Sequence, residues 1–257
     1  MGKIILGPAG LGPVKDAIGN LEEYHKLGFR ACEIAFTYSI YIHKEEDMKR
    51  IGEKAEDLGI RLSIHAPYWI NLNSKEKQKI EDSKKRILSC CEVGEKMGAK
   101  RVVFHPGFYS GMDEEETYGN IKDAVLDMQK EIKGNGWEIE LAPEVMGKIN
   151  VFGSPEQIAR LVKDTGCKFC IDFAHVLARE KKVDYVKIKK LFANENSWHC
   201  HFSGIEYGEK GEKRHVKTPI ERWRELLKNL PKDKNIVIIN ESPDMVNDCV
   251  EGLRILG

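Results

Sequence analysis

The stretch GSPEQIARLVKDTGCKFCIDFAH, residues 153–175, predicts one helix followed by one strand. Ser154 has the hydroxyl that a helix N-cap needs, Pro155 suits the first helical position, and Gly166 suits a left-handed helix end. The apolar run 167–175 follows at once and has the length of a buried strand. A helix that leads directly into an apolar strand is one repeat of a parallel α/β fold.

The same unit recurs along the chain, without a linker or a low-complexity segment. Eight apolar runs qualify as strands: 3–7, 31–36, 60–66, 101–106, 137–144, 167–175, 197–204 and 235–242. Amphipathic stretches lie between them, and one of these helices is expected to have Asn73 or Ser74 as its N-cap. The pattern predicts an α/β fold, a closed (β/α)8 TIM barrel that forms a single domain over residues 1–257. An open doubly wound sheet is the second possibility.

The composition sets few limits on function. Of the 257 residues, 41% are hydrophobic, and 41 Lys and Arg balance 41 Asp and Glu, so a surface that binds a polyanion must come from local clustering of charge. The apolar run near the N-terminus is too short for a secretory signal or a membrane span. We therefore expect a cytoplasmic protein with no membrane partner and, by default, a monomer. Seven irregularly spaced cysteines predict reduced thiols, and we interpret Cys167 and Cys170 as buried small residues rather than half of a zinc ribbon.

Chemically useful side chains lie at the ends of the predicted strands. A barrel places its active site at the carboxyl ends of its strands. Eight imidazoles and carboxylates lie there or in the loop just beyond: His65, His105, Glu144, Asp172, His175, His201, Glu241 and, in the loop after the seventh strand, His215. Buried without partners, such groups are strongly destabilising, whereas bound cations would compensate them. The sequence therefore predicts that they converge on a metal centre.

The ligand types indicate which metal and which chemistry. Imidazole and carboxylate ligands without thiolate suit Zn²⁺, with Mn²⁺ or Fe²⁺ as alternatives. Because a catalytic zinc takes about three protein ligands, eight ligands predict two or three ions. Metal ions about 3.5 to 4 Å apart can hold a hydroxide and stabilise both oxygens of a phosphoryl displacement. Phosphodiester hydrolysis is the reaction that this pattern favours.

Two further polar residues lie within the predicted strands. His199 precedes His201 by two positions, so both side chains point to the same face of the strand. We interpret His201 as the ligand and His199 as its supporting neighbour. Glu33 either points into the barrel near the site or pairs with a buried base, and the sequence leaves both open.

The successive motifs resemble those of the endonuclease IV family of base excision repair. In chain order they are SIHAPYWINL (63–72), VVFHPG (102–107), APEVMGK (142–148), VFGSPEQI (151–158), CIDFAHVLA (170–178), HCHFSG (199–204) and INESP (239–243). The resemblance covers most of the chain. It implies a TIM barrel with three zinc ions that cuts double-stranded DNA on the 5′ side of an abasic site.

The resemblance also implies a role for each strand-end residue. Glu144 would bridge two metal ions, and a hydroxide held between them would attack the phosphorus. The other ligands divide into His65 and His105 at the first ion, Asp172, His201 and Glu241 at the second, and His175 and His215 at the third.

One residue departs from the family pattern. Where the family has an aspartate two residues before the last histidine, this chain has Lys213. A protonated lysine cannot bind a metal ion and would repel one. The third site is then incomplete, and a two-metal enzyme results, unless Glu212 or Glu209 replaces the aspartate.

Exposed aromatic residues are expected at the DNA surface. Tyr68 matches a family tyrosine that inserts at the abasic gap, and Trp69 takes the neighbouring apolar place. A family arginine from the loop after the second strand has no evident counterpart in FTYSIYIHK (36–44), which offers aromatic residues instead. Aromatic faces stack on bases and would replace the arginine in part.

Two other classes of function fit parts of the pattern. Sugar isomerases and epimerases of the xylose isomerase-like barrels resemble this chain at Glu144, Asp172, His201 and Glu241, which form a single-metal site in that group. The four remaining histidines, at 65, 105, 175 and 215, distinguish the nuclease from the sugar enzyme. The third alternative is a catalytically silent barrel that only binds DNA or a sugar phosphate, with Lys213 as the first lost ligand.

Overall fold

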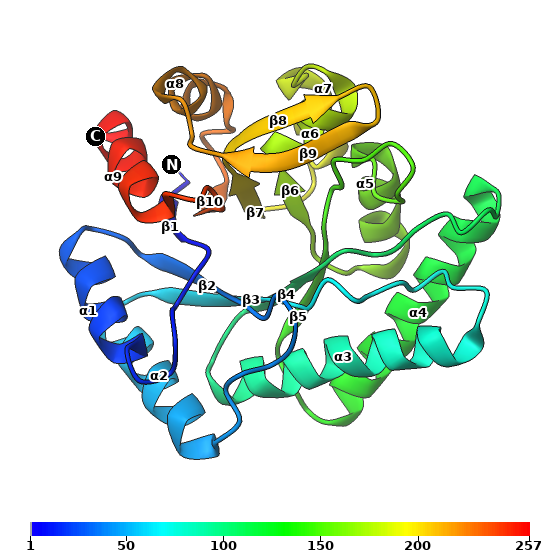
Figure 1. Cartoon of the computed structure of the whole chain (residues 1–257), viewed down its shortest axis with the longest axis horizontal. Coiled ribbons are helices and arrows are strands. Elements are labelled where there is room, and N and C mark those ends of the chain that lie inside the picture. Colours follow the sequence, from blue (N-terminus) through cyan, green and yellow to red (C-terminus); the bar gives the residue numbers. More distant parts are fainter. Residues whose placement is uncertain (1) are drawn as a thin grey trace.

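Eight parallel strands form the centre of the structure, a computed structural model that describes residues 2–257, and helices cover their outer side (Figure 1). The strands are β1 (Ile4–Pro8), β2 (Ala31–Ala35), β3 (Arg61–His65), β4 (Arg101–Phe104), β5 (Glu140–Pro143), β6 (Cys170–Asp172), β7 (Ser197–Phe202) and β10 (Asn235–Asn240). The helices are α1 (Ala17–Lys26), α2 (Glu45–Asp57), α3 (Lys77–Lys96), α4 (Glu114–Gly134), α5 (Pro155–Thr165), α6 (Phe173–Glu180), α7 (Tyr185–Leu191), α8 (Ile220–Asn229) and α9 (Met245–Leu256).

The strands follow one another around a closed ring. Backbone hydrogen bonds order them as β2-β3-β4-β5 in one half and β6-β7-β10-β1 in the other. A parallel bridge between Glu144 and Cys170 joins the halves on one side. On the other side, the Arg30 N–H donates a hydrogen bond of 3.0 Å to the carbonyl of Leu6. The predicted (β/α)8 TIM barrel is therefore confirmed, and the open sheet is excluded.

Side chains of each strand alternate between the helices and the barrel interior. On β2, Cys32 and Ile34 belong to the main hydrophobic core, whereas Ala31 packs with Val237 and Ile239 in a separate small cluster. Since alternate residues of a strand share a face, Glu33 points inward with Ala31. Polar residues with this inward position at the carboxyl ends of the strands meet at one mouth of the barrel.

The start of α5 follows the sequence closely. Ser154 caps it, with its hydroxyl accepting a hydrogen bond from the N–H of Gln157 while the Gln157 side chain accepts from the N–H of Ser154. Pro155 is the first helical residue, and Gly166 ends the helix at a φ of 72°. Three predictions for this helix are confirmed.

The start of α3 does not lie where the sequence suggested. The helix begins at Lys77 after Glu76, not at Asn73 or Ser74. The Asn73 side chain is buried and donates hydrogen bonds to the carbonyls of Phe108 and Tyr109. It therefore ties two loops of the barrel mouth together instead of capping a helix.

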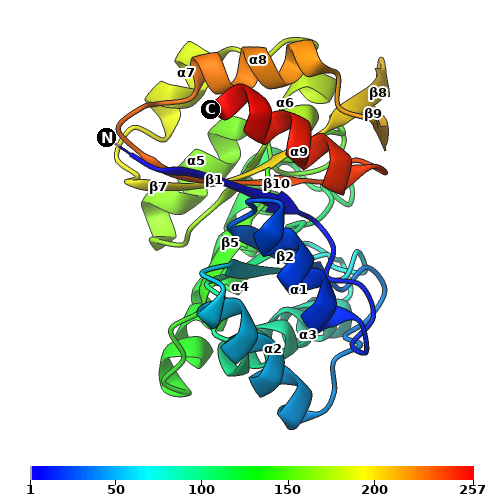
Figure 2. The same cartoon turned by 90° about the vertical axis from the view of Figure 1, so that its left-hand side faces the viewer.

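Two predicted site residues belong to other elements than expected. The sixth strand is shorter than predicted, and His175 lies in the first turn of α6. His215 lies not in a loop but in a hairpin of β8 (Gly204–Gly208) and β9 (Gly211–Val216). Figure 2 shows this hairpin at the end of the barrel opposite the N-terminus, beyond the carboxyl ends of the strands.

All seven cysteines are free and buried, including Cys167 and Cys170, as predicted for reduced thiols. Within residues 2–257, no helix combines the length and the apolar character needed to cross a membrane.

Candidate metal centre

Glu144 lies at the centre of the cluster and contacts four histidines. It follows β5 and is fully buried. Its Oε2 atom lies 3.2 Å from Nε2 of His65 and 3.1 Å from Nε2 of His105. Its Oε1 atom lies 3.2 Å from Nδ1 of His175 and 3.3 Å from Nδ1 of His201. Each oxygen of one carboxylate thus faces a different pair of imidazoles.

The eight predicted ligands form overlapping groups, and in each group the possible ligand atoms lie within 4.8 Å of one another. Three groups together contain all eight residues: His65, His105 and Glu144; Glu144, Asp172, His201 and Glu241; and Asp172, His175 and His215. A fourth group combines His65, His201 and Glu241. The three groups have the same membership that the resemblance to endonuclease IV implied, with Asp172 now also beside the third pair. The structure therefore brings together every residue that the sequence suggested as a ligand.

Hydrogen bonds to the backbone leave one ring nitrogen free in each of two histidines. Nδ1 of His65 donates to the carbonyl of Ala66 at 2.8 Å, and Nδ1 of His175 donates to that of Val145 at 3.0 Å. In the neutral ring, Nε2 then carries the lone pair. In both residues Nε2 is therefore the nitrogen that could bind a metal ion, and a backbone carbonyl holds the ring in place.

The histidines and carboxylates of the cluster stabilise each other's charged forms. Burial disfavours the charged form of His65, but the hydrogen bond and charge of Glu144 outweigh it and raise the pKa of His65 to about 9. Burial also opposes ionisation of Glu144, but the charge of His201 and hydrogen bonds from several histidines hold the Glu144 pKa well below its usual range. Without a cation, the histidines must carry the protons that keep this carboxylate ionised.

Asp172 shows that these residues fit a metal ion. Its Oδ1 atom accepts a hydrogen bond from the N–H of His175, but its fully buried Oδ2 atom has no hydrogen-bond partner among residues 2–257. Oδ2 does lie 3.3 Å from Nδ1 of His175, but that nitrogen already donates to Val145, so the contact is not a hydrogen bond. Burial raises the pKa of Asp172. An orphaned carboxylate oxygen among imidazoles is the arrangement that a bound divalent cation satisfies.

Glu33 and His199 lie directly beneath the centre. The Glu33 carboxylate is fully buried and contacts both histidines of β7, with Oε1 at 2.8 Å from Nε2 of His201 and Oε2 at 3.0 Å from Nε2 of His199. Ser63 donates a further hydrogen bond of 2.8 Å to Oε2. The two alternatives that the sequence left open for Glu33 are thus both realised. The place of Glu33 within a predicted strand was the sequence feature that pointed to a position inside the barrel.

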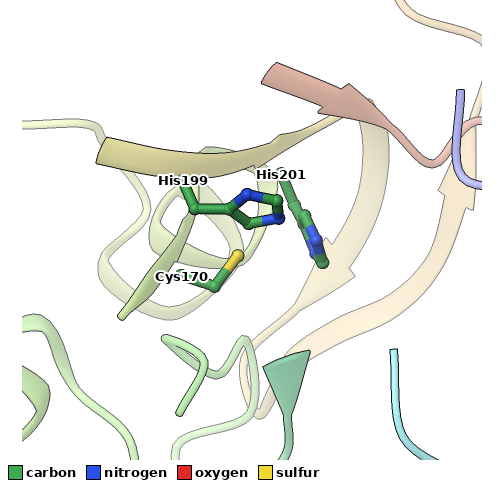
Figure 3. Close-up of side chains that lie close together, drawn as sticks. All are labelled: Cys170, His199 and His201. Carbon is green, nitrogen blue, oxygen red and sulfur yellow. The ribbon is translucent and has the colours of Figure 1, made fainter. Parts of the chain in front are cut away.

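Cys170 lies beside these two histidines. Figure 3 shows His199 and His201 projecting from one side of β7 and the Cys170 thiol from the neighbouring strand β6. The three side chains offer atoms within 4.8 Å of one another. Burial raises the pKa of the Cys170 thiol well above its usual value. A thiol in this state is a poor metal ligand, because the thiolate is the form that binds.

The two predicted DNA-contacting residues lie exposed at the mouth. Tyr68 and Trp69 are 53% and 65% exposed. The Tyr68 ring lies with its centroid 5.4 Å from that of His105, so it overhangs the candidate centre. Large exposed aromatic side chains next to a polar centre mark a binding surface rather than a packed core.

An arginine that the sequence did not single out lies next to this surface. Arg86 of α3 and Tyr38 line a surface pocket of about 510 Å³ together with Pro67 and Lys85. A guanidinium nitrogen of Arg86 lies 3.4 Å from the carbonyl of Trp69. The loop after β2 contains no arginine over residues 36–44, whereas Arg86 comes from α3, the helix after β3.

Comparison with known proteins identifies the family. A family model described as a xylose isomerase-like TIM barrel matches residues 21–254. The chain belongs to this family. An uncharacterized protein of Methanocaldococcus jannaschii is 34% identical over 96% of this chain and 94% of its own length. A probable endonuclease 4 of Mycobacterium leprae is 28% identical, over 60% of this chain and 61% of the relative.

Solved structures of proteins with different functions share the fold. Endonuclease IV from Thermus thermophilus has a TM-score of 0.71 and 21% identity, with 98% of this chain and 97% of that chain covered. A D-psicose 3-epimerase has a TM-score of 0.72 and 17% identity, with both chains fully covered at 100%. At these identities the structures support the fold alone, and the function must be argued from the site.

Proposed function

We propose that this xylose isomerase-like barrel is a metal-dependent endonuclease that hydrolyses DNA on the 5′ side of abasic sites. The observation that carries the proposal is the position of Glu144, with His65 and His105 at one carboxylate oxygen and His175 and His201 at the other. A carboxylate shared between two sets of ligands is suited to hold two ions, as a phosphodiesterase needs.

The donor set supports Zn²⁺ as the resident ion, in two or three copies, with Mn²⁺ or Fe²⁺ as alternatives. When bound, such ions lower the pKa of water and neutralise charge on phosphate oxygens. The protein supplies a rigid frame for this chemistry: Glu144 and Asp172 are fully buried, and the rings of His65 and His175 are fixed by backbone carbonyls. Preorganised ligands need no rearrangement when the substrate arrives.

The exposed aromatic residues support an abasic site in double-stranded DNA as the substrate. A nucleotide that lacks its base leaves a gap in the stack and is easily extruded. Tyr68 and Trp69 lie exposed beside the centre, where they would fill such a gap, and Arg86 and Lys85 offer positive charge nearby. Since the formal net charge of the chain is +0, local cations of this kind must supply the attraction to phosphate. The proposal includes a monomer that acts in the cytoplasm.

The second candidate function is that of a single-metal sugar isomerase or epimerase. The group of Glu144, Asp172, His201 and Glu241 would by itself hold one ion, and a sugar epimerase shares the fold. This function leaves His65, His105, His175 and His215 without a purpose at the same mouth. We therefore favour the nuclease.

Incision of a DNA duplex that carries a tetrahydrofuran abasic analogue tests the proposal. Purified wild-type protein should cut this duplex and not an undamaged one, and should carry at least two divalent ions per chain by elemental analysis. Glu144→Gln should abolish incision and lose more than one ion. Glu140→Gln, at the start of the strand that Glu144 follows but paired with Arg101 away from the centre, is the matched control and should retain both. A single ion per chain together with epimerisation of ketoses would establish the sugar enzyme instead.

A further inference from the structure

A β-bulge in the β8–β9 hairpin decides which residue of β9 faces the centre. In the antiparallel ladder, Ile205 lies opposite His215 and Glu206 opposite Arg214, but Tyr207 lies opposite Glu212. Lys213 therefore has no partner on β8 and is the extra residue of the bulge.

The bulge brings Glu212 to the face that carries His215. Directly opposite residues share a face, and so do Ile205 and Tyr207, which are two positions apart on β8. His215 and Glu212 thus lie on that same face, while Arg214 pairs with Glu206 on the other at 2.8 Å. In a regular strand, Lys213 would have taken the place of Glu212. Because of the one inserted residue, the carboxylate of Glu212 occupies the position that the cationic side chain of Lys213 would otherwise take.

The contacts of Glu212 place it next to the third group of candidate ligands. Its Oε2 atom lies 3.4 Å from Nε2 of His175, and its side chain is 18% exposed. Its N–H donates a hydrogen bond of 3.2 Å to the carbonyl of Gly147. A Cβ atom on Gly147 would lie only 2.8 Å from the Cβ of Glu212, so the absence of a side chain at 147 allows this close approach. Lys213 is exposed, and its side chain lies near Gly208 at the hairpin turn.

We propose that Glu212 is the carboxylate that completes a third metal site with Asp172, His175 and His215. The proposal rests on the multi-metal centre of the proposed function. His175 faces Glu212 with Nε2, the nitrogen left free by the hydrogen bond from Nδ1 to Val145. Two carboxylates and two imidazoles are a ligand set that suits Zn²⁺. The site is complete although the position two residues before His215 holds a lysine.

Metal content and affinity test this assignment independently of catalysis. Glu212→Gln should leave the chain with one ion fewer than the wild type, or bind its weakest ion about 10 to 100 times less tightly in a chelator competition. Glu209→Gln makes the same charge change on the same hairpin, at an exposed position, and should bind as the wild type does. Lys213→Asp should not restore the missing ion to Glu212→Gln, because the bulge turns position 213 away from the site.

The proposal is overturned if Glu212→Gln retains the wild-type number and affinity of ions, or if Lys213→Asp restores the ion. Incision of the tetrahydrofuran duplex, measured on the same preparations, separates this failure from that of the proposed function. A wild type that cuts the duplex, with a Glu212→Gln variant of unchanged metal content, overturns the role of Glu212 alone. A wild type with one ion and no incision overturns both.

Discussion

The Glu33 carboxylate joins two histidines of one strand, lying 2.8 Å from Nε2 of His201 and 3.0 Å from Nε2 of His199. His201 turns its other nitrogen, Nδ1, toward Glu144 and Glu241. A carboxylate behind a metal-binding imidazole fixes the orientation of the ring and makes it a better ligand. Glu33 therefore connects the interior of the barrel to the candidate centre.

Replacement of Glu33 should weaken metal binding without removing a ligand. We expect Glu33→Gln to lower the affinity for divalent ions by about 10 to 100 times. Ser63→Ala removes only the hydrogen bond to Glu33 and should have a smaller effect in the same direction. Chelator competition measures both. Wild-type affinity in Glu33→Gln would show that the His201 ring is held by its packing alone.

The metal-free protein should lose stability as the pH rises above neutrality. The folded-state pKa of His65, about 9, lies above the usual value of 6.5 because Glu144 outweighs the effect of burial. Protonated His65 thus contributes stability that is fully present below about pH 6.5 and is lost as the pH rises to about 9. The pKa of Glu144 is lowered, so its contribution is present above about pH 4.5 and is lost as the pH falls.

Thermal unfolding at pH 6 and at pH 9, with and without a chelator, checks this expectation. The chelated protein should unfold at a lower temperature at pH 9. The metal-loaded protein should be protected at pH 9, since neutral imidazoles are the form that binds metal. His65→Gln should reduce the difference seen with the chelator. Equal midpoints for the chelated protein at both pH values would contradict the coupling of His65 to Glu144.

The strand ends and the cluster of candidate ligands could be predicted from sequence because they depend on local pattern. An apolar run followed by His65, His105 or Glu241 marks both a strand and its carboxyl end, and the barrel topology then brings these ends together. The cap at Ser154 was equally local, since the hydroxyl, the proline and the glycine act within one helix. Predictions of this kind need no knowledge of distant contacts.

The features that the sequence did not reveal depend on contacts between distant segments. The bulge at Lys213 follows from the register of two strands, and Asn73 binds a loop more than thirty residues away, at Phe108, rather than the nearby helix. Local propensity predicted a helix cap at Asn73, and the tertiary hydrogen bonds outweigh it. Arg86 reaches the mouth from α3, which contains none of the motifs shared with the endonuclease IV family.

Removal of the exposed aromatic rings should weaken DNA binding but leave the metal centre intact. We expect Trp69→Ala to cost about 1 to 3 kcal/mol of affinity for a duplex with an abasic site, the range for one stacked base. Fluorescence anisotropy with this duplex measures the loss, and elemental analysis should show unchanged metal content. Tyr38→Ala removes another exposed ring, 74% exposed on a different loop, and should cost less. An equal loss from both variants would argue against a specific role for Trp69.

Closure of the barrel between β1 and β2 should depend on Gly7. A Cβ atom at this position would lie 1.6 Å from the backbone oxygen of Ala31, which no side-chain adjustment can relieve. Gly7→Ala must therefore push the two strands apart, and we expect a loss of at least about 1 to 3 kcal/mol in the free energy of unfolding. A Cβ atom on Gly119, in α4, would meet nothing within 4 Å among residues 2–257 beyond its chain neighbours and the backbone of its own helix. Gly119→Ala should instead stabilise the protein by up to about 1 kcal/mol, because alanine favours the helix. Urea unfolding of both variants measures the change in the free energy of unfolding, which should fall for Gly7→Ala and rise for Gly119→Ala. A Gly7→Ala protein as stable as the wild type would show that the ring of strands is open at this point.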